Sequence, residues 1–91
     1  MRIDKFLKVS RIIKRRTLAK GVCDAGRVQI NGRPAKAGTE VAVGDRLCLI
    51  YGPRLLEVEI VEIKETMAAN QAATMYRVLR EERLKQEQDE L

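Results

Sequence analysis

The stretch TLAKGVCDAGRVQING, residues 17–32, contains a change of hydrophobic period that decides the fold. Its first half has apolar side chains at helical spacing, at Leu18, Val22 and Ala25. After Gly26, a residue type that commonly follows the end of a helix, Val28 and Ile30 alternate with polar residues as in a strand. The stretch therefore predicts a helix over 18–25 that is followed by a strand.

The residues at the two ends of this stretch also predict local structure. Thr17 has the side chain of a good helix N-cap, and Asn31-Gly32 is typical of a tight hairpin turn. Upstream, Ile3, Phe6 and Leu7 have helical spacing, which predicts a first short helix over 3–9. Two short helices thus precede the first strand.

Downstream, apolar residues alternate with polar ones in three further segments, as strands require. The alternating residues are Val41 and Val43, then Leu47, Leu49 and Tyr51, then Leu56, Val58 and Ile60. Pro34 restricts the chain after the hairpin turn to an edge or irregular strand. The period slips at 60–61, which predicts a bulge there.

Residues 66–70 read as a linker, and helical spacing returns after it. Apolar residues at this spacing from Gln71 onward are Ala72, Met75, Tyr76 and Leu79. The sequence therefore predicts an α+β domain over 1–65, with two short N-terminal helices packed on a small twisted antiparallel sheet. Residues 66–91 are expected to form the linker, a C-terminal amphipathic helix and an acidic tail.

The charge of the chain is concentrated at its N-terminal end. The 91 residues carry a net charge of +5, yet residues 1–27 hold nine basic and two acidic side chains, a net charge of +7. Such a field attracts a polyanion to one end of the molecule. The alternative is a face that only keeps the protein in solution, but such faces usually mix both signs of charge.

Three cations, Lys14, Arg15 and Arg16, stand directly before the predicted second helix. The N-terminus of a helix favours anions, and arginine suits bidentate contacts to phosphate. We therefore expect the first two helices and the loop between them to bind RNA. The candidate RNA-binding residues are Arg2, Asp4, Lys5, Lys8, Arg11, Lys14, Arg15, Arg16, Thr17, Lys20 and Arg27.

Asp4 is unusual among so many cations, and two roles are open for it. Its carboxylate can stabilise the start of the first helix through the helix dipole. It can also fix a nearby arginine, such as Arg2 or Arg11, in a geometry that RNA accepts. Of the two, we favour the orienting role.

Other classes of site find little support in the composition. The chain has no histidine and two cysteines, Cys23 and Cys48, which cannot complete a zinc site by themselves. We expect two reduced, buried thiols, no metal, no cofactor, no signal peptide, no membrane contact and a cytoplasmic location. Aromatic residues make up only 3% of the chain, so stacking platforms built from several aromatic side chains are not expected.

Three motifs in the first half of the chain have a specific order and spacing. They are RIDKFL at 2–7, KRRTLAK at 14–20 and GRVQING at 26–32, and VAVGDRLCLI follows at 41–50. Over residues 1–51 the chain resembles the S-four RNA-binding domain (αL motif) of ribosomal and tRNA-binding proteins. With the tail AATMYRVLREERL at 72–84, it resembles more narrowly the RqcP (YabO) family of bacterial ribosome quality-control factors, relatives of heat-shock protein fifteen.

The resemblance implies a function that composition cannot show. Members of this family bind large ribosomal subunits that still carry an obstructed peptidyl-tRNA. They support the addition of C-terminal alanines to the stalled chain by a partner of the RqcH or NEMF type. Carried onto this chain, the family's RNA-facing positions are Arg2, Asp4, Arg11, Lys14, Arg15 and Arg16. We expect a monomer that contacts ribosomal RNA and tRNA.

Four alternatives remain open beside this interpretation. The chain could be a general S-four or heat-shock-protein-fifteen-like RNA-binding protein without a tailing role, or an adaptor whose tail binds another protein. A DNA-binding regulator is disfavoured because residues 18–25 offer few side chains that read base edges. An enzyme is disfavoured because no nucleophile with a base, and no glycine-rich phosphate loop with a lysine, is found.

Overall fold

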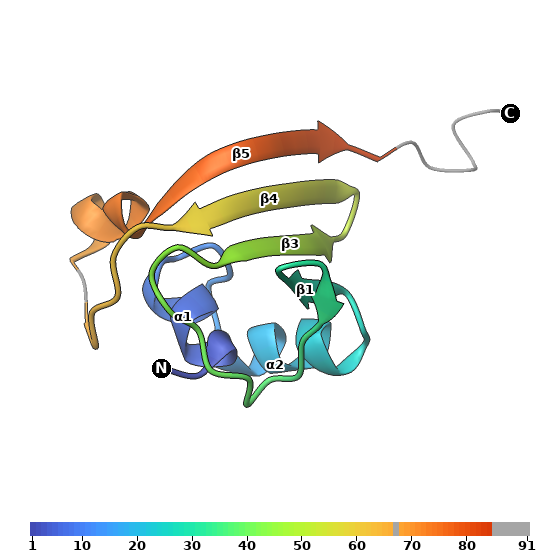
Figure 1. Cartoon of the computed structure of the whole chain (residues 1–91), viewed down its shortest axis with the longest axis horizontal. Helices are drawn as coiled ribbons and strands as arrows, with labels where there is room; N and C mark the ends of the chain where they lie inside the picture. Colours follow the sequence, from blue (N-terminus) through green and yellow to red (C-terminus); the bar gives the residue numbers. More distant parts are fainter. Residues whose placement is uncertain (67, 85–91) are drawn as a thin grey trace, which may run out of the picture.

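The computed structural model describes residues 1–66 and 68–84 and has the α+β architecture that the sequence predicts (Figure 1). All strands of its single sheet are antiparallel, in the order β2-β1-β3-β4-β5. In chain order the elements are α1 (Ile3–Val9), α2 (Arg16–Asp24), β1 (Val28–Ile30), β2 (Arg33–Pro34), β3 (Arg46–Tyr51), β4 (Arg54–Ile60), the 3-10 helix η1 (Ala69–Met75) and β5 (Tyr76–Arg83).

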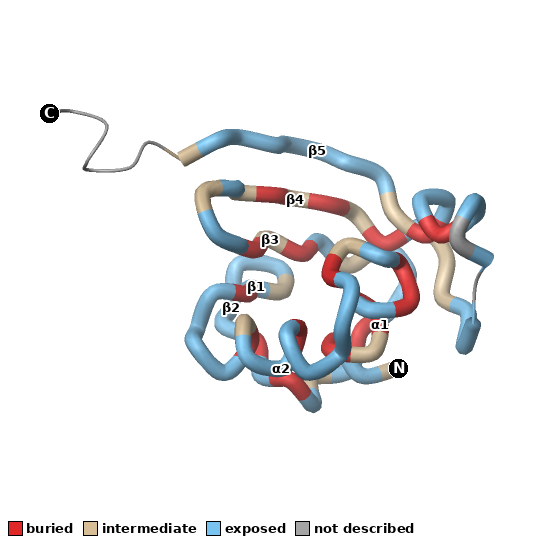
Figure 2. Tube along the Cα trace, turned by 180° about the vertical axis from the view of Figure 1, so that it is seen from behind, coloured by how far each residue is buried: buried red, intermediate tan, exposed pale blue. Residues whose placement is uncertain are grey.

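The core lies between the two α-helices and one face of the sheet (Figure 2). Ile3, Phe6 and Leu7 of α1 are fully buried there. Strands β3 and β4 contribute every second residue to the core, as a pleated sheet requires, including Leu47 and Val58. Each large aliphatic side chain buried in this way stabilises the fold by roughly 1.5–3 kcal/mol, so the helices are held firmly on the sheet.

Several of the predicted boundaries are confirmed and others are wrong. The first helix and the Asn31-Gly32 turn are confirmed, and both turn residues have positive φ, 50° and 82°. The second helix begins at Arg16 and not after Thr17, and no side chain caps it, so the N-cap prediction for Thr17 is wrong. Val41 and Val43 lie in a loop and not in a strand; the N–H of Val41 donates to the carbonyl of Met1.

The predicted C-terminal amphipathic helix is wrong, because a short 3-10 helix and then a strand occupy that segment. The 3-10 helix η1 ends at Met75, which is fully buried, and β5 then pairs with β4 along its whole length. The bulge lies between Glu57 and Val58, where β5 has one extra residue, Leu79, and not at 60–61. Residues 85–91, most of the predicted acidic tail, lie outside the described residues.

Within the described residues, no helix has the length and apolar character needed to cross a bilayer.

Candidate nucleic-acid interface

Asp4 is buried at the start of α1, with 2% of its surface exposed, and connects the two helices. One carboxylate oxygen, Oδ1, accepts hydrogen bonds from the backbone N–H of Lys5 at 2.8 Å and from Nη2 of Arg16 at 3.4 Å. The other, Oδ2, accepts from Nη2 of Arg2 at 3.3 Å. We call these three side chains the Arg2–Asp4–Arg16 cluster.

The cluster places two guanidinium groups at the surface in a fixed relation. The side chains of Arg2 and Arg16 are 48% and 47% exposed, while that of Asp4 is 3% exposed. Each arginine uses a single nitrogen on Asp4, so its other donors remain available to a phosphate. Both roles expected for Asp4 are compatible with this geometry, but its arginine partners are Arg2 and Arg16. Arg11 is not among its partners in the described part of the chain.

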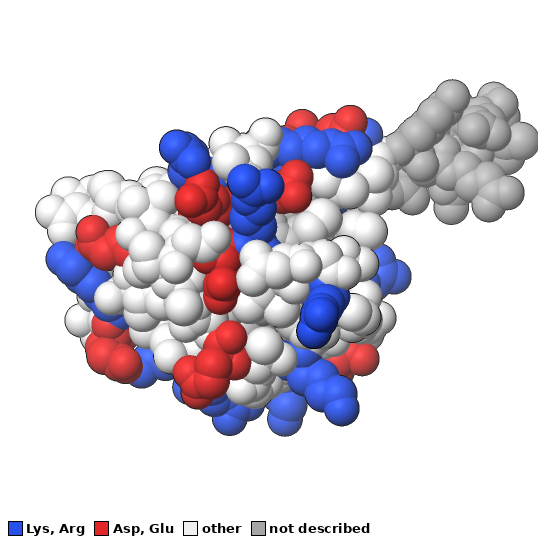
Figure 3. All heavy atoms as spheres, viewed as in Figure 1, with Lys and Arg blue, Asp and Glu red and all other residues white. Residues whose placement is uncertain are grey.

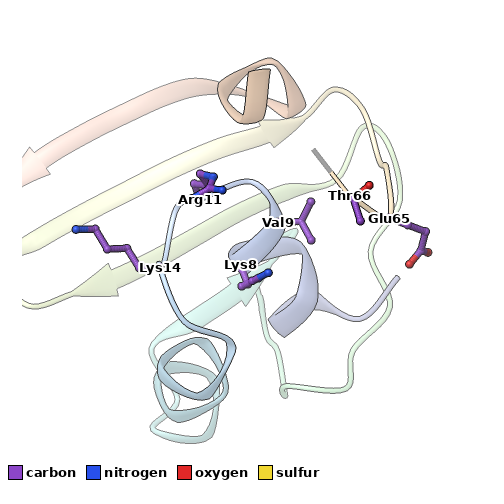
Figure 4. A pocket seen from close by; sticks show the side chains of 6 residues that line it. All are labelled: Lys8, Val9, Arg11, Lys14, Glu65 and Thr66. Carbon is purple, nitrogen blue, oxygen red and sulfur yellow. The ribbon is translucent and has the colours of Figure 1, made fainter. Parts of the chain in front are cut away.

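A second group of cations surrounds a cavity of about 200 Å³ beside the end of α1 (Figure 4). Lys8, Arg11 and Lys14 line it from α1 and the following loop, and the segment after β4 contributes Glu65 and Thr66. None of the three cations forms an ion pair with another described residue. This basic cavity therefore has uncompensated positive charge to offer an anion.

Arg11, which lines this cavity, has an unusual backbone conformation. Its φ is 61°, in the left-handed region where glycine normally follows a helix. The Arg11 N–H donates to the carbonyl of Lys8, which ends α1 in this turn. A side chain at this position costs stability, because its Cβ crowds the backbone.

We expect Arg11→Gly to raise the free energy of unfolding by up to about 1 kcal/mol and to weaken RNA binding. Glycine relieves the strain, and the guanidinium is lost with the side chain. Arg11→Ala is the matched control, because it keeps the strained backbone and should weaken binding without stabilising the fold. Thermal melting and an RNA titration on both variants check this. Undiminished RNA binding by both variants would contradict a role for Arg11 at the interface.

The remaining candidate residues differ in their surroundings. Lys5 pairs with Glu65, sixty positions away; its hydrogen bond and its charge lower the pKa of that carboxyl. Arg15, Thr17 and Lys20 are exposed at the start of α2 or on it, and Arg27 lies just after it. Basic side chains line the lower rim in Figure 3, where Figure 1 places α2 and the loop before β3.

Two features of this region were missed by sequence reasoning. Glu65 compensates Lys5, and Arg54 at the start of β4 lines a cavity together with Lys14. No local pattern indicates either contact, because both join segments that only the folded sheet brings together.

The two cysteines, Cys23 and Cys48, are free and form no disulfide. Among the described residues no group of three or more histidine, cysteine or carboxylate side chains is placed to hold a metal ion. Burial, and then the charges of Asp4 and Asp24, raise the pKa of Cys23 to about 11. Cys48 is only half-buried, less than expected; burial and the neighbouring Glu57 raise its pKa too. A raised pKa favours the protonated thiol, which is the less reactive form of cysteine.

The comparisons of sequence and of structure with known proteins agree with one another. The model of the S4 domain family matches residues 1–47. The chain is 57% identical to the RQC P-site tRNA stabilizing factor of Halalkalibacterium halodurans, over 90% of this chain and 93% of that protein. It is 55% identical to the protein of the same name in Bacillus subtilis, over 92% and 98%. The structure is similar to that of heat shock protein 15 of Vibrio cholerae, described as trimeric, with a TM-score of 0.80, 32% identity and coverage of 86% and 80%.

Proposed function

Because this chain belongs to the S4 domain family, we propose that it binds structured RNA through α1, α2 and the loop between them. Its RNA ligand is tRNA in the P site of a large ribosomal subunit, together with neighbouring ribosomal RNA. The observation that carries the proposal is the Arg2–Asp4–Arg16 cluster, in which a buried carboxylate holds two half-exposed guanidinium groups. The basic cavity of Lys8, Arg11 and Lys14 supplies further phosphate contacts nearby.

The arrangement suits phosphate binding for a physical reason. Arginine side chains lose much conformational freedom when they bind, and this loss weakens binding. Asp4 restricts Arg2 and Arg16 before RNA arrives, so less freedom remains to be lost. Lys8, Arg11, Lys14 and Arg15 are exposed and are free to follow the shape of the backbone.

The finer part of the proposal concerns ribosome quality control in the cytoplasm. The chain stabilises peptidyl-tRNA on obstructed large subunits as a monomer, while a partner of the RqcH or NEMF type adds alanines to the stalled chain. Its support is the name that the relatives carry, RQC P-site tRNA stabilizing factor, and their near full-length similarity. The protein itself performs no chemical step.

A reconstituted tailing reaction tests this finer part. Large subunits with a stalled chain, the partner and charged alanyl-tRNA are combined with or without this protein, and tail length is read on a gel. We expect longer tails when the protein is present. Subunit binding without any effect on tails would favour the general RNA-binding alternative, for which the similarity to heat shock protein 15 is the supporting observation.

We also expect the affinity for RNA to fall steeply with salt, because phosphate contacts release counterions. Five such contacts would give a log–log slope of about −3.5 to −4.5. Binding to large subunits, measured from low to high salt, checks this value. A flat response would mean that the basic face is only solvated and would favour the adaptor alternative.

A further inference from the structure

An apolar groove lies beside the RNA-binding face, between α2 and the end of β3. Its volume is about 420 Å³. The residues that form it include Leu18 and Val22 of α2 and Ala25 directly after it, then Arg27, Tyr51 and Gly52. Leu18 is an exposed large apolar side chain in this part of the surface.

Tyr51 has a special position at one end of this groove. It follows Leu47 and Leu49 on the face of β3 that is turned toward the helices, but it lies past the end of the core and is 39% exposed. Tyr51 also lines a second cavity of about 330 Å³, which it shares with Lys14 and Arg54. The chain has three aromatic residues, and Tyr51 is the exposed one: Phe6 is fully buried and Tyr76 is half-buried.

The charges around the groove indicate what can occupy it. The linings of the two cavities include three cations, Arg27, Lys14 and Arg54, and no carboxylate of a described residue. Arg54 is paired with Glu81, so Arg27 and Lys14 are the two without an ion-pair partner among the described residues. A flat apolar group attached to an anion fits this combination better than an apolar protein segment does.

We propose that the groove accepts one unpaired nucleobase of the bound RNA, stacked on the ring of Tyr51. The aliphatic side chains of Leu18 and Val22 cover the base, and Arg27 and Lys14 contact the phosphates on its two sides. Proteins that bind unpaired RNA commonly stack splayed-out bases on aromatic side chains in this way. The inference rests on the proposed function, since the base belongs to RNA that the α1–α2 face holds.

Three RNA hairpins with one common stem test the inference. One is fully paired, one has a single bulged adenosine, and one has an abasic nucleotide at the bulge, which keeps the bend but lacks the base. We expect the parent protein to bind the adenosine bulge about tenfold more tightly than the abasic bulge. Tyr51→Leu should remove this difference, and Tyr51→Phe, which keeps the ring, should retain it.

A crosslinking measurement on the parent protein makes the test independent of how well the variants fold. The adenosine of the bulge is replaced by 4-thiouridine, and the crosslinked peptide is identified by mass spectrometry. We expect crosslinks to Tyr51 or to the groove side of α2. Equal affinity for the adenosine and abasic bulges, or crosslinks confined to other residues, would overturn the inference and leave the proposed function standing. Binding to none of the hairpins would overturn the inference, and failure to bind large ribosomal subunits as well would overturn the proposed function.

Discussion

We expect the Asp4→Arg variant to be unfolded under conditions in which the parent protein is folded. The position is 2% exposed, and two guanidinium groups lie within 3.4 Å of the carboxylate. A third cation at this site would be buried beside two guanidinium groups without a partner, and burying an unpaired charge costs several kcal/mol. Small domains are stable by only about 5–15 kcal/mol in total. A circular dichroism melting curve checks the expectation; a cooperative transition near that of the parent would contradict it.

The burial of Asp4 also decides which variant can test its role in binding. Because the Asp4→Arg variant is expected to unfold, it cannot show whether Asp4 orients Arg2 and Arg16 for RNA binding. At an exposed position, charge reversal would have left the fold intact and allowed that test. Asp4→Asn keeps the shape and removes the charge, and we expect it to fold with a loss of about 1–3 kcal/mol. Arg2 and Arg16 would then be held less firmly, so RNA affinity should fall even though the net charge rises by one.

Glu82→Gln supplies the matched control for this substitution. It raises the net charge by the same amount at an exposed residue of β5, where the carboxylate pairs with Arg80 and has no contact with the cluster. We expect it to bind RNA at least as tightly as the parent. If folded Asp4→Asn binds as tightly as Glu82→Gln, the orienting role of Asp4 is wrong.

The N-terminal half of the fold could be predicted because its determinants are local. The spacing of Ile3, Phe6 and Leu7 and the dipeptide Asn31-Gly32 each act within a few residues, and both elements form where the sequence indicates. The start of α2 was misplaced by two residues because the helix begins without a side-chain cap. Helix boundaries depend on such details more than helix existence does.

The C-terminal segment could not be predicted from its own residues. Leu79 and its arginine and glutamate neighbours favour helices, but intrinsic propensity is a weak influence that tertiary contacts override. Here β4 offers an open edge, and residues from Tyr76 to Arg83 complete the sheet along it. Burial of Met75 at the end of η1 fixes where the strand begins.

In the candidate site, too, some features follow from nearby residues and others only from the folded structure. The sequence indicates that Asp4 is out of place among cations, and Arg2 is close enough in the chain to be suspected as its partner. Arg16 is twelve positions away from Asp4, and only the packing of α1 against α2 brings the two together. The aromatic content argued against stacking platforms, and it could not reveal that the single exposed ring lies beside an apolar groove.

The second large effect that we expect is a loss of RNA affinity when the uncompensated cations are neutralised together. The interface variant replaces four residues by glutamine: Lys8, Arg11, Lys14 and Arg15. The control variant makes the same change of net charge away from this face: Arg46, Arg77, Arg80 and Arg83. Charge-assisted contacts contribute about 1.5–3 kcal/mol each, so the interface variant should lose at least about 100-fold in affinity for large subunits.

The control variant should retain its affinity within about threefold, because screened charges far from the contact contribute little. Equilibrium titration of fluorescent protein with large subunits gives both values. Equal losses in the two variants would mean that binding depends on total charge and not on the α1–α2 face.

The most direct test of the proposed function is the rate at which labelled peptidyl-tRNA leaves the P site of isolated large subunits. A protein that binds the subunit and its tRNA together must slow this release, because binding of each ligand stabilises the other. We predict slower release with the parent protein and with the control variant, and release at the unassisted rate with the interface variant. An unchanged rate in the presence of saturating parent protein would contradict the account.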